Sequence, residues 1–164
     1  MNRSKYRVFV YGTLMKNFYG YRKYLKSAKF IGNAKIKGKL YLTNSNYPVA
    51  ILSKGKKPIY GEIYEVDKDT MIKLRNYEGI YSFFTYYKET ITPAMLETGE
   101  KIFVRCFVAH PLAILFILFT GKYIKSGDWK GFTQNPPFPY RKWALTMILI
   151  LFNLILLLEL VLEA

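Results

Sequence analysis

The chain has 164 residues and a formal net charge of +14, from 25 Lys and Arg against 11 Asp and Glu. Cys106 is its one cysteine and His110 its one histidine. A single cysteine excludes an internal disulfide and a cysteine zinc site. One cysteine and one histidine also supply few of the residues that metal sites and thiol or serine catalytic triads need. The length allows one domain with a core and a tail, whose chemistry is expected to rest on carboxylates, hydroxyls and main-chain amides.

The first predicted element is a buried strand, Tyr6 to Val10, because apolar residues occupy nearly every position. It runs directly into Tyr11, Gly12, Thr13 and Leu14. Gly12 allows unusual main-chain dihedrals and lets a ligand come close to the N–H groups. Successive N–H groups in such a turn form a concavity that suits a carboxylate or phosphate. The alternative is an ordinary strand exit without a ligand.

The lysines are scattered along the chain and predict no nucleic-acid site. Lys35, Lys37 and Lys39 alternate, which indicates the solvated face of a strand. The chain has no arginine-rich helix or metal finger, so nucleic acid is not an expected partner. Attraction to an anionic membrane surface fits the positive charge better.

A helix is predicted after Asp67, a good N-cap residue, with Asp69 in the first turn complementing the helix dipole. Met71, Leu74 and Glu78 fall at i, i+3 and i+7, which is one face of this helix. Since the two apolar residues would point at the core, Glu78 is expected to point the same way.

Glu78 breaks a local rule of helix design. It precedes Gly79, a predicted C′ residue, at the helix end where the dipole disfavours negative charge. Burial and dipole should both raise its pKa, and a violation of this kind often marks function. The alternative is a glutamate that curls outward at a frayed helix end.

Two apolar segments follow in the chain. The first, Cys106 to Phe119, overlaps a predicted strand from Ile102 to Val108 and continues as Leu112 to Phe119 after His110-Pro111. With fourteen residues interrupted by His110-Pro111, it is too short to span a bilayer as a helix. A core strand and a membrane-dipping hairpin both remain open for it, and His110 is expected to be packed rather than catalytic.

The second apolar segment, residues 143–162, would form a helix of about 30 Å, the thickness of a bilayer core. Arg141 and Lys142 precede it, and Trp143 stands where an interfacial aromatic belongs. We predict a membrane anchor after a Pro-rich linker at 135–142, with the domain on the cytoplasmic side. The alternative is a buried helix packed on the domain or in an oligomer core.

Six short motifs occur in an order and spacing that resemble the γ-glutamylcyclotransferase-like family, which includes the AIG2-like γ-glutamylamine cyclotransferases. The motifs are Tyr11-Gly12-Thr13-Leu14, Gly38-Lys39-Leu40-Tyr41, Tyr47-Pro48, residues 61–66, Tyr77-Glu78-Gly79 and Ser126-Gly127-Asp128-Trp129. The resemblance covers roughly residues 5 to 132. Members of the family are usually more polar at the positions of Leu112 to Phe119. In addition, Lys88 stands in place of Arg in a Tyr-x-Arg element, so no role is assigned to it.

The resemblance implies an α+β fold, a small mixed β-barrel with flanking helices, to which this chain adds a C-terminal apolar helix. The implied organisation is a domain at 1–134, the linker at 135–142 and the apolar helix at 143–164. It also implies a catalytic Glu78 and a substrate-binding segment formed by Tyr11, Gly12, Thr13 and Leu14, with no cofactor and no metal.

The implied activity is the release of 5-oxoproline from a γ-glutamyl amino acid or amine by intramolecular cyclisation. The alternative is a non-catalytic, membrane-tethered module with the same barrel. Glu78 separates the two: the binding module is favoured if Glu78 points outward or if no cavity lies between Glu78 and Gly12.

Overall fold

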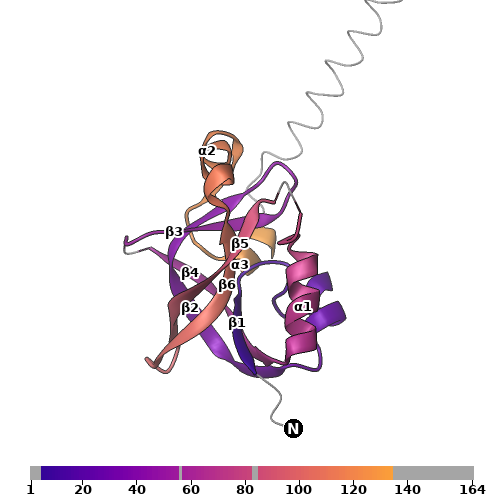
Figure 1. Cartoon of the computed structure of the whole chain (residues 1–164). Coiled ribbons are helices and arrows are strands. Elements are labelled where there is room, and N and C mark those ends of the chain that lie inside the picture. Colours follow the sequence, from indigo (N-terminus) through magenta and orange to yellow (C-terminus); the bar gives the residue numbers. More distant parts are fainter. Residues whose placement is uncertain (1–4, 56, 83–84, 135–164) are drawn as a thin grey trace, which may run out of the picture. The chain divides into compact units, whose positions relative to one another are not determined.

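The computed structural model describes residues 5–55, 57–82 and 85–134, which build a closed β-barrel (Figure 1). The ring follows the strand order β2-β4-β1-β6-β5 and closes because β5 also pairs with β2. β1 is parallel to β6, and the other pairs in the ring are antiparallel. The strands of the ring are β1 (Tyr6–Val10), β2 (Lys29–Leu42), β4 (Pro58–Val66), β5 (Tyr87–Leu96) and β6 (Lys101–Ala109). The predicted small mixed barrel with flanking helices is confirmed.

β2 connects the ring to two further strands. Its first part pairs with β4, and its last part pairs with β3 (Pro48–Leu52) on one side and β7 (Lys122–Ile124) on the other. Buried and exposed residues alternate along its middle, with Lys35, Lys37 and Lys39 exposed. The prediction that these lysines mark a solvated strand face is confirmed.

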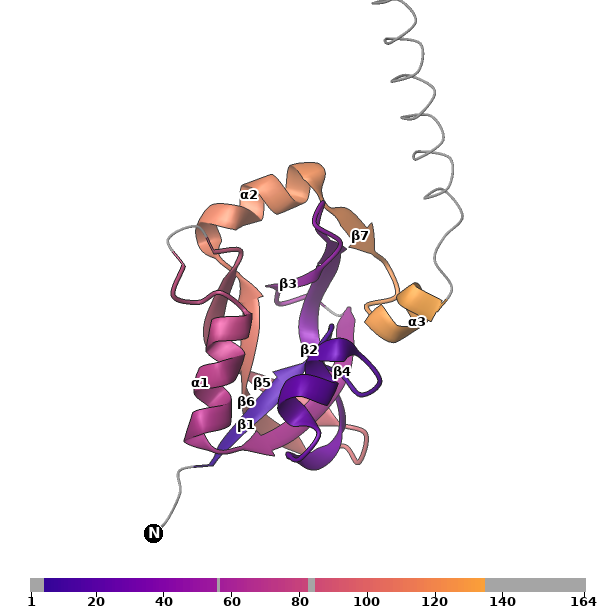
Figure 2. The same cartoon turned by 90° about the vertical axis from the view of Figure 1, so that its right-hand side faces the viewer.

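α1 (Lys68–Tyr77) lies beside the barrel, next to a π-helical turn, η1 (Tyr21–Leu25) (Figures 1 and 2). The Asp67 carboxylate accepts a hydrogen bond of 2.8 Å from the main-chain N–H three residues later, as expected of an N-cap. Met71 and Leu74 are fully buried. The predicted helix start and its core-facing side are therefore confirmed.

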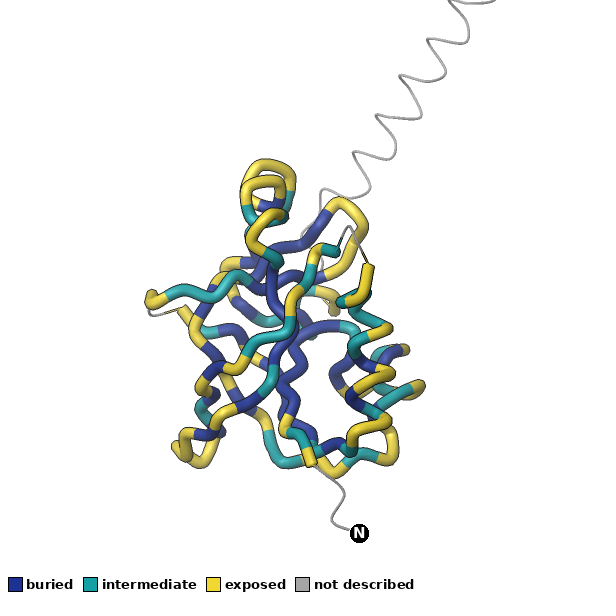
Figure 3. The backbone as a smooth tube through the Cα atoms, in the orientation of Figure 1, coloured by how far each residue is buried: buried dark blue, intermediate teal, exposed yellow. Residues whose placement is uncertain are grey.

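α2 (Pro111–Thr120) is a helix, so both interpretations of Leu112 to Phe119, a core strand and a membrane-dipping hairpin, are wrong. His110 is its N-cap: the imidazole Nδ1 accepts a hydrogen bond from the Leu112 N–H at 3.4 Å, and Pro111 occupies the first turn, where proline is tolerated. The His-Pro pair begins the helix rather than interrupting a strand. Of the α2 residues only Ile117 is buried, and most of the helix is exposed (Figure 3).

The Ser-Gly-Asp-Trp motif attaches to β4. The Gly127 carbonyl accepts a hydrogen bond from the Tyr60 N–H at 3.0 Å, and Gly127 has a φ of +67°. A Cβ at this position would collide with the Pro58 carbonyl. Only glycine fits here, for both reasons. The motif leads into α3 (Trp129–Gln134), where the Trp129 side chain is buried.

The predicted linker at 135–142 and the predicted apolar helix and membrane anchor at 143–164 lie outside the described residues. Within the described ranges, no helix combines the length and the apolar character needed to span a membrane.

Candidate active site

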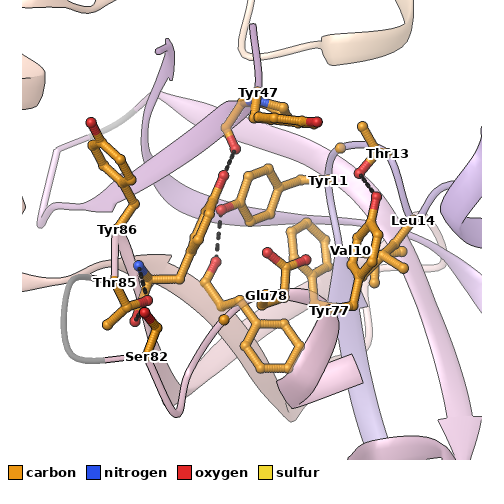
Figure 4. A pocket seen from close by; sticks show the side chains of 16 residues that line it. Val10, Tyr11, Thr13, Leu14, Tyr47, Tyr77, Glu78, Ser82, Thr85 and Tyr86 are labelled. Carbon is orange, nitrogen blue, oxygen red and sulfur yellow. Dashed lines mark hydrogen bonds between the residues drawn. The ribbon is translucent and has the colours of Figure 1, made fainter. Parts of the chain in front are cut away.

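A cavity of about 370 Å³ opens at one end of the barrel (Figure 4). Segments that are far apart in the chain build its wall: the end of β1 with the glycine loop, the start of β3, the end of α1 and the start of β5. The described residues that line it are Phe9, Val10, Tyr11, Gly12, Thr13, Leu14, Tyr47, Pro48, Tyr77, Glu78, Gly79, Ser82, Thr85, Tyr86, Tyr87 and Phe107. All five site residues named from the sequence therefore line a single cavity.

The end of α1 holds Glu78 in place. Glu78 is the C-cap residue, and its N–H still donates to the Leu74 carbonyl at 2.9 Å. The next residue, Gly79, has a φ of +67°. The N–H groups of Gly79 and Ile80 donate to the Asn76 and Arg75 carbonyls, at 3.1 and 3.0 Å. This pair of hydrogen bonds is the Schellman motif, and it orients the main chain of Glu78 at the cavity wall.

The Glu78 carboxyl points into the cavity, toward the space between Tyr11 and Tyr77 (Figure 4). Burial raises its pKa from the ordinary value of 4.5 to about 8. A buried carboxyl with a pKa near neutrality can accept and return a proton, which is what general acid–base catalysis requires. Cys106, by contrast, is fully buried and absent from the cavity wall, and burial raises the pKa of its thiol. A thiolate nucleophile is therefore disfavoured here.

Tyr11 joins three strands through its hydroxyl, which donates to the Phe107 carbonyl (2.7 Å) and accepts from the Ala50 N–H (3.1 Å). Burial, together with the neighbouring Tyr87, raises the pKa of Tyr11 well above its usual value, so the hydroxyl stays protonated. Both of these hydrogen bonds are made within the protein, so they fix the position of the Tyr11 side chain at the cavity wall. The sequence predicted Tyr11 as a site residue, but it did not indicate the hydrogen-bond partners of the Tyr11 hydroxyl.

The glycine loop carries Gly12 to Leu14 past the cavity. The carbonyls of Gly12 and Thr13 accept hydrogen bonds from the Met15 N–H (3.0 Å) and the Gly20 N–H (3.1 Å). Within the described residues, the N–H groups of Thr13 and Leu14 donate no hydrogen bond. Both residues line the cavity, so their N–H groups are available to an anion bound there.

A hydrogen bond between side chains joins the glycine loop to α1, the helix that ends at Glu78. The Thr13 Oγ1 and the Tyr77 hydroxyl lie 2.9 Å apart, and the Tyr77 ring packs on Tyr24 of η1 with ring centres 5.1 Å apart. The positions of the loop and of the end of α1 are thereby coupled.

The lining residues to which the sequence assigned no site role include Tyr47, Pro48, Tyr86 and Tyr87. The Tyr87 hydroxyl donates to the Pro48 carbonyl at 2.9 Å. Burial and the nearby Glu78 carboxylate raise the pKa of Tyr87, which keeps its hydroxyl a donor. The motifs that contain these residues were visible in the sequence, but only the pairing of distant strands places them beside Glu78.

The wall of the cavity carries few charges. Glu78 is the one Asp, Glu, Lys, Arg or His among the described lining residues. The carboxylate of a ligand would therefore be held by neutral groups, which are the N–H groups of the loop and the surrounding hydroxyls. No group of three His, Cys, Asp or Glu side chains suited to a metal ion occurs in the described part of the chain.

A second carboxylate, Glu62 on β4, is buried just behind the loop, with 4% of its surface exposed. It accepts hydrogen bonds from the Lys16 N–H (2.7 Å) and the Tyr64 hydroxyl (2.8 Å), and it forms an ion pair with Lys130. Its position on a strand gave no sign of this burial. Glu62 faces away from the cavity lining and connects the end of the glycine loop to the residue after Trp129.

Comparisons with known proteins identify the family to which the chain belongs. Residues 8–131 match the family model described as gamma-glutamyl cyclotransferase, AIG2-like. A Methanocaldococcus jannaschii protein named "Putative gamma-glutamylcyclotransferase" is 32% identical over 125 residues, which is 76% of this chain and 96% of the relative.

Two solved structures are also similar. An aig2-like protein from Mus musculus is 26% identical, with a TM-score of 0.61 over 74% of this chain and 87% of the mouse chain. An uncharacterized protein from Pyrococcus horikoshii is 31% identical, with a TM-score of 0.54 over 79% of this chain and 93% of the other. The chain belongs to the gamma-glutamyl cyclotransferase, AIG2-like family.

Proposed function

We propose that this protein is a γ-glutamylcyclotransferase that releases 5-oxoproline from γ-glutamyl amino acids or amines. The observation that carries the proposal is that Glu78 and the glycine loop line the same cavity. A proton acceptor and a set of anion-binding amides are the two parts that this reaction needs.

The γ-glutamyl group binds with its α-carboxylate on the main-chain N–H groups of the loop from Gly12 to Leu14. This leaves the α-ammonium and the γ-carbonyl within the cavity near Glu78. Because the nucleophile and the electrophile belong to one molecule, the site has to fold the substrate into a ring-closing pose and move a proton.

Glu78 then acts as a general base and a general acid in turn. It removes a proton from the α-ammonium, and the freed amine attacks the γ-carbonyl carbon to form the five-membered ring. Glu78 returns the proton to the departing nitrogen as the bond between that nitrogen and the γ-carbon breaks. The ring nitrogen loses its second proton to water, and the released amine takes one up. The raised pKa of Glu78, about 8, suits this task because it narrows the gap between the pKa of the base and that of the α-ammonium, so the proton can be taken up and returned.

The second candidate is a binding module with the same barrel and no turnover. Its distinguishing signs would be an outward Glu78 or the absence of a cavity between Glu78 and Gly12, and the geometry supports neither. The test is 5-oxoproline release by the purified full chain from a panel of γ-glutamyl peptides and amines, with the Glu78→Gln variant prepared in parallel. Release by the wild type alone supports the enzyme. Binding of panel members without release by either protein would favour the module.

A further inference from the structure

A second hollow adjoins the cavity. It has a volume of about 670 Å³ and shares Ser82, Thr85, Tyr86 and Tyr87 with the cavity. The two spaces are therefore adjacent, and only the side chains that they share lie between them.

Its far wall is apolar and comes from α2. Leu112, Ala113 and Phe116 line it together with Ile80, and the Phe116 ring lies 6.2 Å from the shared Tyr86 ring. Leu112 is 87% exposed and Phe116 is 48% exposed. We call this second hollow, with its wall of α2 residues, the apolar groove.

Leu112 and Phe116 are exposed because α2 packs on the barrel with other side chains. The helix attaches to the barrel through Ile117, Ala113 and Ile114, which pack against a cluster that includes Tyr41 and Val49. Leu112 and Phe116 contribute little to this attachment. Large apolar side chains that remain exposed next to a site often serve binding.

Most of the charged or titratable groups around the apolar groove are engaged within the protein. The Glu89 carboxylate is held by the Arg75 and Arg105 guanidinium groups, and the His110 Nδ1 accepts the Leu112 N–H. Lys88 is exposed to solvent at the groove. What remains to contact a ligand beside the shared tyrosines is mainly hydrocarbon.

We propose that the apolar groove binds the leaving amine of the substrate and that this amine is apolar. The inference rests on the proposed function. With the glutamyl part beside Glu78, the amine part has to leave the cavity, and the wall formed by Tyr86 and Tyr87 leads it to α2. The substrate class is thus the γ-glutamyl amides of apolar amines, or of amino acids with apolar side chains.

The test compares γ-glutamyl hexylamide with γ-glutamyl methylamide on the full chain. Each methylene moved from water to an apolar wall is worth up to about fourfold in affinity, and the groove is open to solvent, so we expect kcat/KM to be at least ~10-fold higher for the hexylamide. Phe116→Ser and Leu112→Ser should each reduce this ratio toward one. Phe119→Ser is the matched control: Phe119 is 84% exposed on the same helix but lines neither hollow, so its ratio should equal that of the wild type.

Equal kcat/KM for the two amides in the wild type would overturn the groove assignment while leaving the proposed function intact, and so would an equal loss of preference in the Phe116 and Phe119 variants. If neither amide is cyclised, the proposed function fails, and calorimetric binding of both amides to the full chain decides the groove separately. Tighter hexylamide binding that depends on Phe116 would retain the groove as a ligand site. Equal binding would remove it.

Discussion

Gly12 and Pro48 are so close that a Cβ added to Gly12 would lie 2.5 Å from the Pro48 Cγ. The glycine is therefore needed for the packing of the loop on β3, in addition to the access of a ligand that the sequence suggests. Pro48 in turn accepts the Tyr87 hydroxyl through its carbonyl. A shift of Pro48 would thus disturb the cavity wall on two sides.

Gly12→Ala should lower the free energy of unfolding by about 1–3 kcal/mol, as overpacking does elsewhere, and reduce cyclisation together with it. Chemical denaturation and 5-oxoproline release measure the two effects. Gly55→Ala is the control, because its added Cβ would meet only the Ser53 Oγ at 3.5 Å. Pro48→Ala in the Gly12→Ala background should restore part of the stability. A fully stable Gly12→Ala variant would contradict the packing role.

Glu78→Gln should abolish cyclisation while the fold and substrate binding persist. Gln is nearly isosteric but cannot carry a proton, and general acid–base catalysis is worth about 10²–10⁴-fold. The measurements are kcat for 5-oxoproline release and substrate affinity by calorimetry. Turnover at the wild-type rate in this variant would refute the mechanism.

The pH dependence follows from the pKa of Glu78, about 8. Since the base must be ionised and the substrate must still carry its α-ammonium proton, kcat/KM should rise with pH toward about 8 and fall again once the α-ammonium of the free substrate loses its proton. The pH–rate profile of the wild type over pH 5–10 measures this. A profile that is flat between pH 6 and 9 would be inconsistent with Glu78 as the base.

Ionisation of Glu78, which promotes activity as the pH rises, lowers the stability of the folded protein. The folded state holds the pKa of Glu78 at about 8, above the value of 4.5 for an ordinary carboxyl, so its contribution is full below pH 4.5 and is lost as the pH rises toward 8. The Tm of the wild type should therefore fall relative to that of Glu78→Gln over this window. Parallel Tm curves for the two proteins would show that Glu78 titrates normally.

Glu62 and Lys130 form an ion pair in which the Glu62 side chain is buried and the Lys130 side chain is 34% exposed. Lys130→Met leaves the buried Glu62 carboxylate without this cation, and we expect a loss of about 1–3 kcal/mol in the free energy of unfolding. Adding Glu62→Gln should recover part of it. Lys5→Met, which breaks a solvent-exposed ion pair with Glu65, is the control and should have little effect. Equal effects of the two lysine substitutions would show that burial of Glu62 is unimportant.

The apolar segment at 143–162 still predicts a membrane anchor. The full chain should sediment with vesicles of mixed anionic and neutral phospholipid and resist extraction by high salt, whereas a chain truncated after Pro136 should stay in the supernatant. Recovery of the full chain as a monodisperse protein without detergent or lipid would refute the anchor.

Local patterns in the sequence were enough to predict several elements of the fold, and the resemblance to the family implied the barrel. The strand at Tyr6 to Val10, the N-cap at Asp67 and the alternating lysines of β2 depend on neighbours within a few residues, and so does the turn at Gly79. The helix face shared by Met71, Leu74 and Glu78 follows from helical geometry alone. The order of the short motifs then pointed to the family.

Only the tertiary structure showed which side chains meet at the cavity and which are buried behind it, because both depend on contacts between segments that are distant in the chain. The partners of the Tyr11 hydroxyl lie on β3 and β6, and Tyr87 reaches Pro48 across 39 positions of the chain. The burial of Glu62 depends on Lys130, 68 positions away. Hydrophobicity indicated a core strand or a membrane-dipping hairpin at Leu112 to Phe119, whereas the segment is a helix that packs on the barrel through Ile117 and leaves most of its side chains exposed. No local signal reports which neighbour a side chain will meet once the barrel has closed.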